Sequence, residues 1–286
     1  MRRSAGIVLA GGRSSRMGSP KAGLEWHGST LLRRTVGILA RLGPVAVVRA
    51  AGQALPSLPA GVQVVDDPRE GLGPLQGIAA GLAAVADLAE FAFVCSTDLP
   101  FLHPAFVRRI LGAAETAAPP ADVVLPVARG FAQPLAAGYR TALAPLAEQL
   151  VARGRLRPGY LFEQCAVLRL DEVTLAADPL LTALDPGLDS LVNVNTPADY
   201  LLARHRPAPD IVVRRSGTLT PGGSDLTMVS AATLAQAVAA VGMTLGGSVI
   251  AVLNGEQVVA DAEFALASGD TVVFMAAADR ARPDQA

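Results

Sequence analysis

The chain has 286 residues, of which 51% are hydrophobic, so it has enough apolar material for a large buried core and for two domains. A formal net charge of −1 excludes a general attraction to nucleic acid or to an anionic membrane, and phosphate binding must therefore come from a local site. Cys95 and Cys165 are the only cysteines and lie in apolar contexts, which argues against a disulfide framework and favours a reducing cytoplasm.

Short apolar strands alternate with helical patterns through the first two hundred residues. The first predicted strand, at 5–10, follows two arginines, but its apolar run is too short for a signal peptide or a membrane span. Ser29 is the expected N-cap of the next helix, which ends at Gly43. This alternation predicts a mostly parallel sheet with helices on both faces. The remaining predicted strands are 45–48, 62–65, 91–95 and 123–126, and the remaining helices are 75–88 and 103–110.

A linker with two prolines, at 204–209, precedes a second and smaller pattern. Asn254-Gly255 is typical of a type I′ hairpin turn between two strands of that pattern. The order of its elements predicts a small α+β domain. Its predicted strands are 211–213, 226–229, 248–253, 257–259 and 271–275, and its predicted helix is 233–241. We therefore expect one domain at 1–204, a second at 210–278 and a disordered tail at 279–286.

The segment from Leu9 to Lys21 reads LAGGRSSRMGSPK and directly follows the first strand. Its glycines let the backbone approach an anion closely, and Arg13, Arg16 and Lys21 add three cations. The carboxyl end of a strand is also where open α/β sheets bind ligands. The spacing matches neither the P-loop nor the dinucleotide fingerprint, so the glycines alone leave open an ordinary turn with solvated arginines. Lys21 is the only lysine in the chain, and lysine and arginine are not interchangeable at phosphates.

This segment and three others resemble one enzyme family. Leu-Ala-Gly-Gly, then Ser-x-Arg-Met-Gly, then Lys21 resembles the signature of the molybdenum cofactor guanylyltransferases, which are MobA-like NTP transferases. Gly-Pro-Leu-Gln-Gly at 73–77, Ser-Thr-Asp-Leu-Pro at 96–100 and Asn-Val-Asn-Thr-Pro at 193–197 resemble further segments of that family in the same order. The resemblance covers residues 4–203 and implies a Rossmann-like nucleotidyltransferase domain.

The resemblance also implies a reaction. A guanine nucleotide passes from GTP to the terminal phosphate of molybdopterin, pyrophosphate leaves, and Mg²⁺, or alternatively Mn²⁺, assists. Positioning and charge neutralisation dominate the barrier between two such polyanions. Asp98 is expected to bind the metal and the nucleotide, while Arg16 and Lys21 grip the triphosphate. Backbone contacts to the nucleotide are expected from Leu9, Ala10, Gly11 and Gly12.

Further nucleotide contacts are expected at the end of the third strand and at the start of the following helix. Asp67 and Gly77 are the residues expected there, with Asp66 as an alternative to Asp67. Arg49 stands where family members often carry an asparagine near the nucleotide. This departure leaves the choice of guanine over cytosine as an inference.

Three amides are expected on the acceptor side. Asn193 and Asn195 would orient the pterin phosphate or a metal-bound water, and Gln133 would contact the acceptor substrate. A turn or solvated role is the alternative for each asparagine, because asparagine is a frequent turn residue. The three histidines are scattered and are expected to be structural or solvated.

The stretch at 210–277 resembles the β-grasp (ubiquitin-like) sulfur carriers ThiS and MoaD. The resemblance rests on Leu-Asn-Gly-Glu at 253–256 and on Leu-Ala-Ser-Gly-Asp at 266–270. Those carriers end in Gly-Gly, whereas this chain ends in Asp-Gln-Ala. The domain is therefore expected to dock proteins of the molybdenum cofactor pathway rather than to carry sulfur.

Other functions remain open. A sister enzyme on the same scaffold would transfer a cytidylyl or another nucleotidyl group to a phosphorylated small molecule. A catalytically inactive scaffold would bind nucleotide without turnover. A sulfur carrier would place the main function in the second domain, and the missing Gly-Gly argues against it. Neither nucleic acid nor a membrane is an expected partner.

Overall fold

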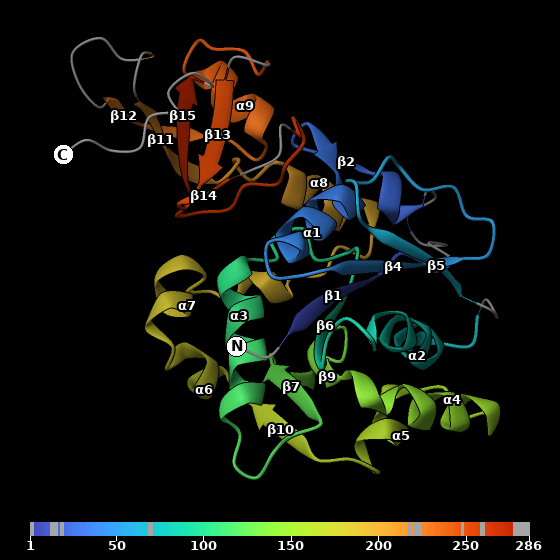
Figure 1. Ribbon diagram of the computed structural model, residues 1–286. Coiled ribbons are helices and arrows are strands. Elements are labelled where there is room, and N and C mark those ends of the chain that lie inside the picture. Colours follow the sequence, from blue (N-terminus) through green and yellow to red (C-terminus); the bar gives the residue numbers. More distant parts are fainter. Residues whose placement is uncertain are drawn as a thin grey trace. The chain divides into compact units, whose positions relative to one another are not determined.

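The computed structural model describes residues 3–11, 17, 20–67, 71–216, 219, 225–246, 249–257 and 261–276. The chain divides into two compact units, the first made of Met1–Leu24 and Thr30–Ala203 and the second of Glu25–Ser29 and Arg204–Ala286. Figure 1 labels their helices and strands. Within the described part, no helix is both long and apolar enough to cross a membrane. The expected tail at 279–286 lies outside these residues.

The first unit is built on a mostly parallel sheet, as predicted. β1 is an interior strand, pairing in parallel with β4 on one side and β6 on the other, with Leu9 opposite both Val48 and Ser96. β9 runs antiparallel between β6 and β7, and β8 forms a hairpin with β7. These two strands and β10, which pairs in parallel with β7, were not predicted from the sequence. The strands are β1 (Ser4–Leu9), β4 (Val45–Ala50), β5 (Gln63–Asp67), β6 (Phe91–Ser96), β7 (Val123–Ala128), β8 (Phe131–Ala132), β9 (Ala136–Arg140) and β10 (Val167–Leu170).

Helices cover both faces of this sheet. α1 and α3 pack on one face and α2 and α4 on the other (Figure 1). α3 continues beyond its predicted end at residue 110, because Ala113 and Ala114 still bury their side chains. The α-helices are α1 (Leu31–Ala40), α2 (Pro74–Val85), α3 (Pro104–Thr116), α4 (Ala144–Ala152), α5 (Pro158–Phe162), α6 (Glu172–Ala176), α7 (Pro179–Leu184) and α8 (Pro197–Arg204). Short 3-10 helices lie at Lys21–Gly23, Thr141–Leu143 and Asp189–Leu191.

The first helix begins one residue later than predicted. Thr30 is the N-cap of α1, and its Oγ1 accepts a hydrogen bond from the Arg33 amide at 3.2 Å. The hydroxyl of Ser29 instead donates to Glu263 at 2.9 Å, within the second unit. The prediction of Ser29 as the cap is therefore wrong, because its hydroxyl is engaged elsewhere.

The second unit contains a five-stranded mixed sheet and one described helix. The strand order is β12-β11-β15-β13-β14, with β11 and β15 parallel and the other neighbouring pairs antiparallel. Leu234 and Val238 of α9 pack with Ile211 and Phe274 of the sheet in one buried cluster. The elements are β11 (Asp210–Ser216), β12 (Asp225–Ser230), α9 (Leu234–Ala240), β13 (Val249–Leu253), β14 (Glu256–Gln257) and β15 (Thr271–Ala276).

The predicted turn at Asn254-Gly255 is confirmed. Both residues have positive φ, 49° and 90°, as a type I′ turn requires. The Asn254 amide nitrogen donates to the buried Asp270 carboxylate at 2.9 Å, and its Oδ1 accepts from the Thr271 amide at 2.8 Å. One side chain thus ties the hairpin to the turn before β15, which links the two motifs noted in this part of the sequence.

The short segment Glu25–Ser29 belongs to the second unit, although it follows Lys21 closely in sequence. It contains β2 (Glu25–Trp26) and the start of β3 (Ser29–Thr30). Arg204 donates to the Glu25 carboxylate, and Gln236 donates to the His27 carbonyl at 2.9 Å. The sequence did not indicate this association, because Gln236 and His27 are 209 residues apart.

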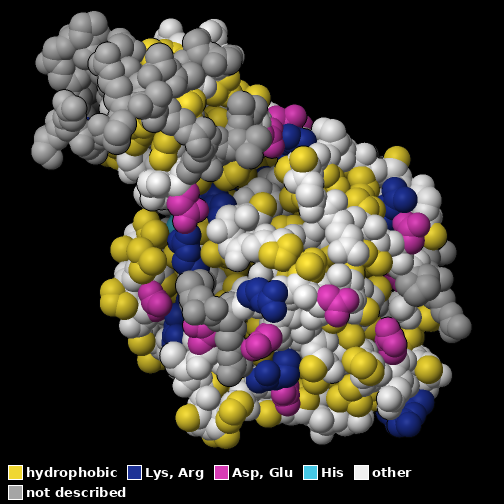
Figure 2. Space-filling view, in the orientation of Figure 1, with side chains coloured by type: hydrophobic (Ala, Val, Ile, Leu, Met, Phe, Trp, Pro, Cys, Tyr) yellow, Lys and Arg dark blue, Asp and Glu magenta, His cyan; other side chains and the backbone are white. Residues whose placement is uncertain are grey.

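The described surface carries both signs of charge. Lys or Arg and Asp or Glu side chains are interspersed over the face shown in Figure 2. This pattern agrees with the net charge of −1. Any strong attraction for a phosphate must therefore arise from the local arrangement of a few side chains.

The close packing of α2 on β1 depends on a missing side chain. A Cβ at Gly81 would lie 2.4 Å from Cγ2 of Ile7, a fully buried, β-branched residue of β1. Ile7 has little room to move, because protein interiors are close-packed. Gly112 of α3 provides a contrast, because a Cβ there would meet nothing within 4 Å.

Gly81→Ala is expected to lower the free energy of unfolding by about 1–3 kcal/mol, the usual cost of overpacking a core. The matched change Gly112→Ala is expected to be neutral or to stabilise by up to about 1 kcal/mol, because alanine is the better helix former. Urea unfolding of both variants and of the wild type measures these values. Equal effects at the two glycines would contradict the packing argument.

Candidate active site

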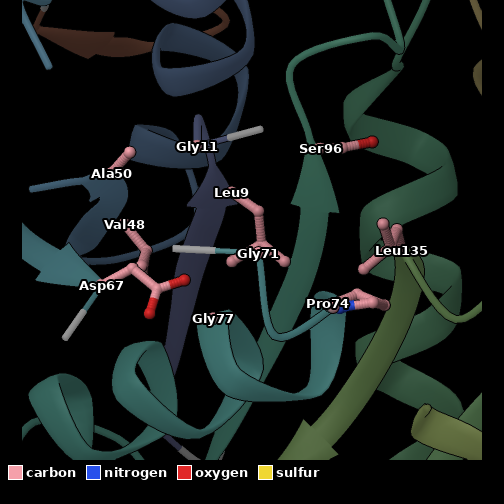
Figure 3. Close-up of a pocket in the computed structure, with 11 residues that line it drawn as sticks. Leu9, Gly11, Val48, Ala50, Asp67, Gly71, Pro74, Gly77, Ser96 and Leu135 are labelled. Atoms are coloured by element: carbon pink, nitrogen blue, oxygen red, sulfur yellow. The ribbon is translucent and has the colours of Figure 1, made fainter. Parts of the chain in front are cut away.

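A cavity of about 440 Å³ opens at the carboxyl edge of the parallel strands (Figure 3). The ends of β1, β4 and β5 and the first turn of α2 line it, together with Ser96 and Leu135. Parallel strands end at the same edge of a sheet, so residues remote in sequence converge here. The volume lies within the range of small-molecule sites in proteins.

The end of β1 meets the cavity through Leu9 and Gly11. The Ala10 and Gly11 amides both donate to the Val48 carbonyl, at 2.8 and 3.2 Å. These two N–H groups therefore bond to β4 in this structure. Gly11 also permits this close approach, because a Cβ there would lie 3.0 Å from the Ala50 nitrogen.

The two aspartates that end β5 point in different directions. Asp67 lines the cavity, and in Figure 3 its carboxylate is turned toward the start of α2. Asp66 accepts a hydrogen bond from Arg49 at 2.7 Å, and Arg49 also donates to the Gln53 carbonyl at 2.9 Å. Successive side chains of a strand point to opposite faces, which explains the division. Asp67 is thus the one of the two that lines the cavity, with Gly77 of α2 as another lining residue.

Lys21 joins two segments that are remote in sequence. Its Nζ donates to Oδ2 of Asp98 at 3.2 Å and to Oδ1 of Asn195 at 3.0 Å. The side chains of Lys21 and Asp98 are only 17% and 16% exposed, so salt screens this ion pair less than a pair on the open surface. Lys21 begins a 3-10 helix after Pro20, and Asp98 follows the end of β6.

Two further side chains hold Asp98 and Asn195 in position. The Ser96 hydroxyl donates to Oδ1 of Asp98. Asp199 Oδ2 accepts from the backbone amides of Asn195 and Thr196, at 3.1 and 2.9 Å. Thr196 Oγ1 accepts from the Asp199 amide at 3.1 Å, which completes a reciprocal capping box at the start of α8. This role of Asp199 was not predicted from the sequence, although the Thr-x-x-Asp spacing is a signal for it.

The other predicted site residues are placed differently. Gln133 donates its amide to two backbone carbonyls of the β7–β8 hairpin, at 3.3 and 3.4 Å, and Asn193 donates to the Leu191 carbonyl at 3.4 Å. Both amides therefore support local turns, while Asn195 joins the Lys21 cluster. Gly12, Arg13 and Arg16 lie outside the described residues.

The donor set around Asp98 fits a divalent metal that arrives with its substrate. In the part of the chain that the structure describes, no three His, Cys, Asp or Glu side chains gather into a metal-binding group. Asp98 offers one carboxylate, and Ser96 and Asn195 place hydroxyl and amide oxygens nearby. Mg²⁺ prefers such hard oxygen donors and completes its shell with phosphate oxygens and water.

Comparison with known proteins identifies the family. Residues 6–166 match the model of the MobA-like NTP transferase domain. The chain belongs to the MobA-like NTP transferase family. The match covers the β1 end, the cavity and Asp98, and it stops before Asn195.

The alignments with relatives of this MobA-like chain cover most of each relative's length. A probable molybdenum cofactor guanylyltransferase of Mycobacterium tuberculosis is 42% identical over 170 residues, which covers 58% of this chain and 82% of the relative. One of Mycobacterium ulcerans is 40% identical over 210 residues, covering 72% and 92%. The crystal structure of molybdopterin-guanine dinucleotide biosynthesis protein A from Archaeoglobus fulgidus has the same fold, with a TM-score of 0.56 and 21% identity over 70% of this chain and 96% of that one.

Asp199 generates a pH-dependent prediction. The Thr196 hydroxyl, the amides of Asn195 and Thr196 and the charge of Lys21 lower the pKa of Asp199 below its ordinary value of 3.8. A lowered pKa means that the carboxylate contributes stability above the unfolded-state pKa and loses it as pH falls through the native one. Asp199→Asn is therefore expected to lower the Tm at neutral pH, with a difference from wild type that closes below pH 3.8.

Thermal unfolding between neutral pH and the acid limit of the native state measures this difference. Asp87→Asn is the matched control, because it removes the same charge from an exposed turn after α2. A Tm difference that does not change with pH, or an equal difference for both variants, would contradict the role assigned to the Asp199 carboxylate.

Proposed function

We propose that this chain transfers GMP from GTP to the terminal phosphate of molybdopterin, with release of pyrophosphate and with Mg²⁺ (or Mn²⁺) as the assisting ion. The observation that carries the proposal is the cluster of Lys21, Asp98 and Asn195 at the sheet edge that also bears the cavity. Its support is the family membership and the names of relatives that are about 40% identical.

The residues divide the work between nucleotide and phosphates. The cavity takes the nucleoside, with Leu9 on its wall and with Gly11 and Gly77 allowing close approach to the backbone. Lys21 holds the β- and γ-phosphates, so that the departing pyrophosphate is neutralised as the Pα–O bond to it breaks. Asp98 would hold the divalent ion, which when bound screens the charge between the two polyanions. An oxygen of the molybdopterin phosphate attacks the α-phosphate, and Asn195 would orient it.

Asp67 supplies a reason for guanine. Guanine presents two neighbouring donors, its N1–H and its 2-amino group, and one carboxylate accepts both. Cytosine lacks that pair of donors. A buried donor or acceptor left unpaired is costly, so a carboxylate on the cavity wall discriminates between the bases.

We further propose that the second unit is a β-grasp domain. Its support is the strand order β12-β11-β15-β13-β14, with parallel β11 and β15 and with α9 after the first hairpin. In this proposal it docks proteins of the molybdenum cofactor pathway, which would deliver molybdopterin to the transferase. The functional boundary between the two domains then lies at 204–210.

Calorimetric titration with GTP, CTP, ATP and UTP in the presence of Mg²⁺ tests the nucleotide site. GTP is expected to bind best, and Asp98→Ala and Lys21→Ala are each expected to weaken its binding by at least about tenfold, which is about 1.4 kcal/mol. Asp87→Ala is the control for Asp98→Ala, and Arg153→Ala is the control for Lys21→Ala. Each removes a charge of the same sign from an exposed position.

Each outcome of this titration selects one function. Preference for CTP would favour the sister activity on the same scaffold. Binding of GTP without formation of a dinucleotide product from molybdopterin would favour an inactive scaffold. Failure to bind any nucleotide would overturn the site itself.

Base selection gives a separate prediction. Asp67→Asn is expected to reduce GTP affinity by about tenfold and to leave CTP affinity unchanged, because an amide oxygen accepts from only part of the guanine edge. Asp66→Asn removes the same charge from the neighbouring position, which is directed to Arg49, and should preserve the preference. Equal loss of GTP and CTP binding in Asp67→Asn would assign Asp67 to the ribose or to folding.

A further inference from the structure

The Lys21 ammonium occupies the oxygens that a divalent ion would need. Its Nζ lies 3.2 Å from Oδ2 of Asp98 and 3.0 Å from Oδ1 of Asn195. The other Asp98 oxygen, Oδ1, accepts from the Ser96 hydroxyl. A metal that binds Asp98 through Oδ2 would therefore share that oxygen with an ammonium group that is already there.

Two cations do not share these oxygens without a compensating anion. A divalent ion and an ammonium a few ångströms apart repel strongly, and the repulsion is larger where water is largely excluded. Both side chains of the ion pair are more than four-fifths buried, with 17% and 16% exposed. A triphosphate removes the conflict, because its oxygens accept from the ammonium and also ligate the metal.

We propose that Lys21 and the divalent metal are alternative occupants of the Asp98–Asn195 oxygens. Lys21 holds these oxygens in the nucleotide-free enzyme and leaves them only when a metal–triphosphate complex offers it phosphate oxygens. Metal binding is thereby made dependent on nucleotide binding. This inference rests on the proposed function, and it adds an exchange of cations that the roles assigned above do not contain.

Lysine is suited to such an exchange, and arginine is not. A lysine side chain is a point charge on a flexible stem, whereas the planar guanidinium of arginine holds a carboxylate through two parallel hydrogen bonds. Lys21 is the only lysine of a chain whose Lys and Arg residues number 24. The exception falls at the position where a mobile cation is needed.

The acceptor oxygens stay in place when the ammonium leaves. Ser96 holds the Asp98 carboxylate through Oδ1, and Asp199 holds the backbone amides of Asn195 and Thr196. Neither anchor uses the oxygens that face Lys21. The two occupants therefore meet the same preformed set of donors.

Mn²⁺ binding without nucleotide, measured by electron paramagnetic resonance, tests the competition. Lys21→Met removes the ammonium and is expected to tighten Mn²⁺ binding by about tenfold or more relative to wild type. Lys21→Arg keeps the charge and is expected to give no such gain. Arg49→Met is the matched control, because it removes one positive charge that is paired with Asp66.

A double variant and a test of GTP binding complete the experiment. Asp98→Asn placed in the Lys21→Met chain should abolish the gained Mn²⁺ affinity, which assigns the gain to Asp98. Unchanged or weaker Mn²⁺ binding in Lys21→Met, or an equal gain in Arg49→Met, would overturn the exchange. If wild type binds Mn²⁺ and GTP together while Lys21→Met shows no gain in Mn²⁺ affinity, the exchange is wrong and the proposed function stands. If the protein binds no nucleotide, both the proposed function and the exchange are wrong.

The lone lysine also permits a direct readout. Protein grown with lysine labelled with ¹³C at Cε has one labelled side chain, so a single resonance reports on Lys21. That resonance is expected to shift when Mg²⁺ and GTP are added together without acceptor, and to remain in place with Mg²⁺ alone at the same concentration. A full shift with Mg²⁺ alone, or no shift with Mg²⁺ and GTP, would contradict the proposal.

Discussion

The contact of one ammonium group with two oxygens is the constraint on which the first unit's site depends. Asp98 and Asn195 lie 77 and 174 residues from Lys21 in the sequence, so most of the unit must fold before the three meet. The parallel pairing of β1 with β6 brings two of the segments together, because Leu9 lies opposite Ser96 and the two strands end at the same edge of the sheet. The residue before Asn195 then donates its amide to the Asp98 carbonyl at 2.9 Å, which joins the third segment to the second.

Glycines shape the cavity beside this cluster, because they have no side chain. Gly81 lets α2 approach β1, and a Cβ at Gly77 would lie 3.3 Å from Leu9 on the cavity wall. Gly11 likewise lets the ends of β1 and β4 approach each other. The room for a ligand is therefore a product of backbone packing, while the polar groups that give it chemistry come from strand ends and loops.

The sequence predicts the strands and helices of this fold well where burial leaves a pattern. β1, β4 and β6 are apolar apart from Ser4, Arg49 and Ser96, and the Asn254-Gly255 turn has the backbone that its residues favour. Prediction fails where a contact between residues remote in sequence determines the local structure. Ser29 and Thr30 are equally good caps on paper, and only the hydrogen bond of Ser29 to Glu263 selects Thr30. Antiparallel β9 was missed because its sequence, Ala-Ala-Gly-Tyr-Arg, contains small residues and no β-branched one. The motif residues Lys21, Asp98 and Asn195 meet in the structure. Asp199, which acts through Asn195, was missed, although its Thr-x-x-Asp spacing is a helix-capping signal.

The assignment of Glu25–Ser29 to the second unit has a consequence for how such a protein is built. The chain passes between the units after Leu24, after Ser29 and after Ala203, so the second unit is not an appendage joined by one linker. Arg204 and Gln236 bind a segment that the transferase sequence itself supplies. Simple gene fusion adds a domain at an end, whereas here part of the second unit lies inside the transferase sequence. A second unit transplanted as residues 204–286 alone would therefore lack Glu25–Ser29.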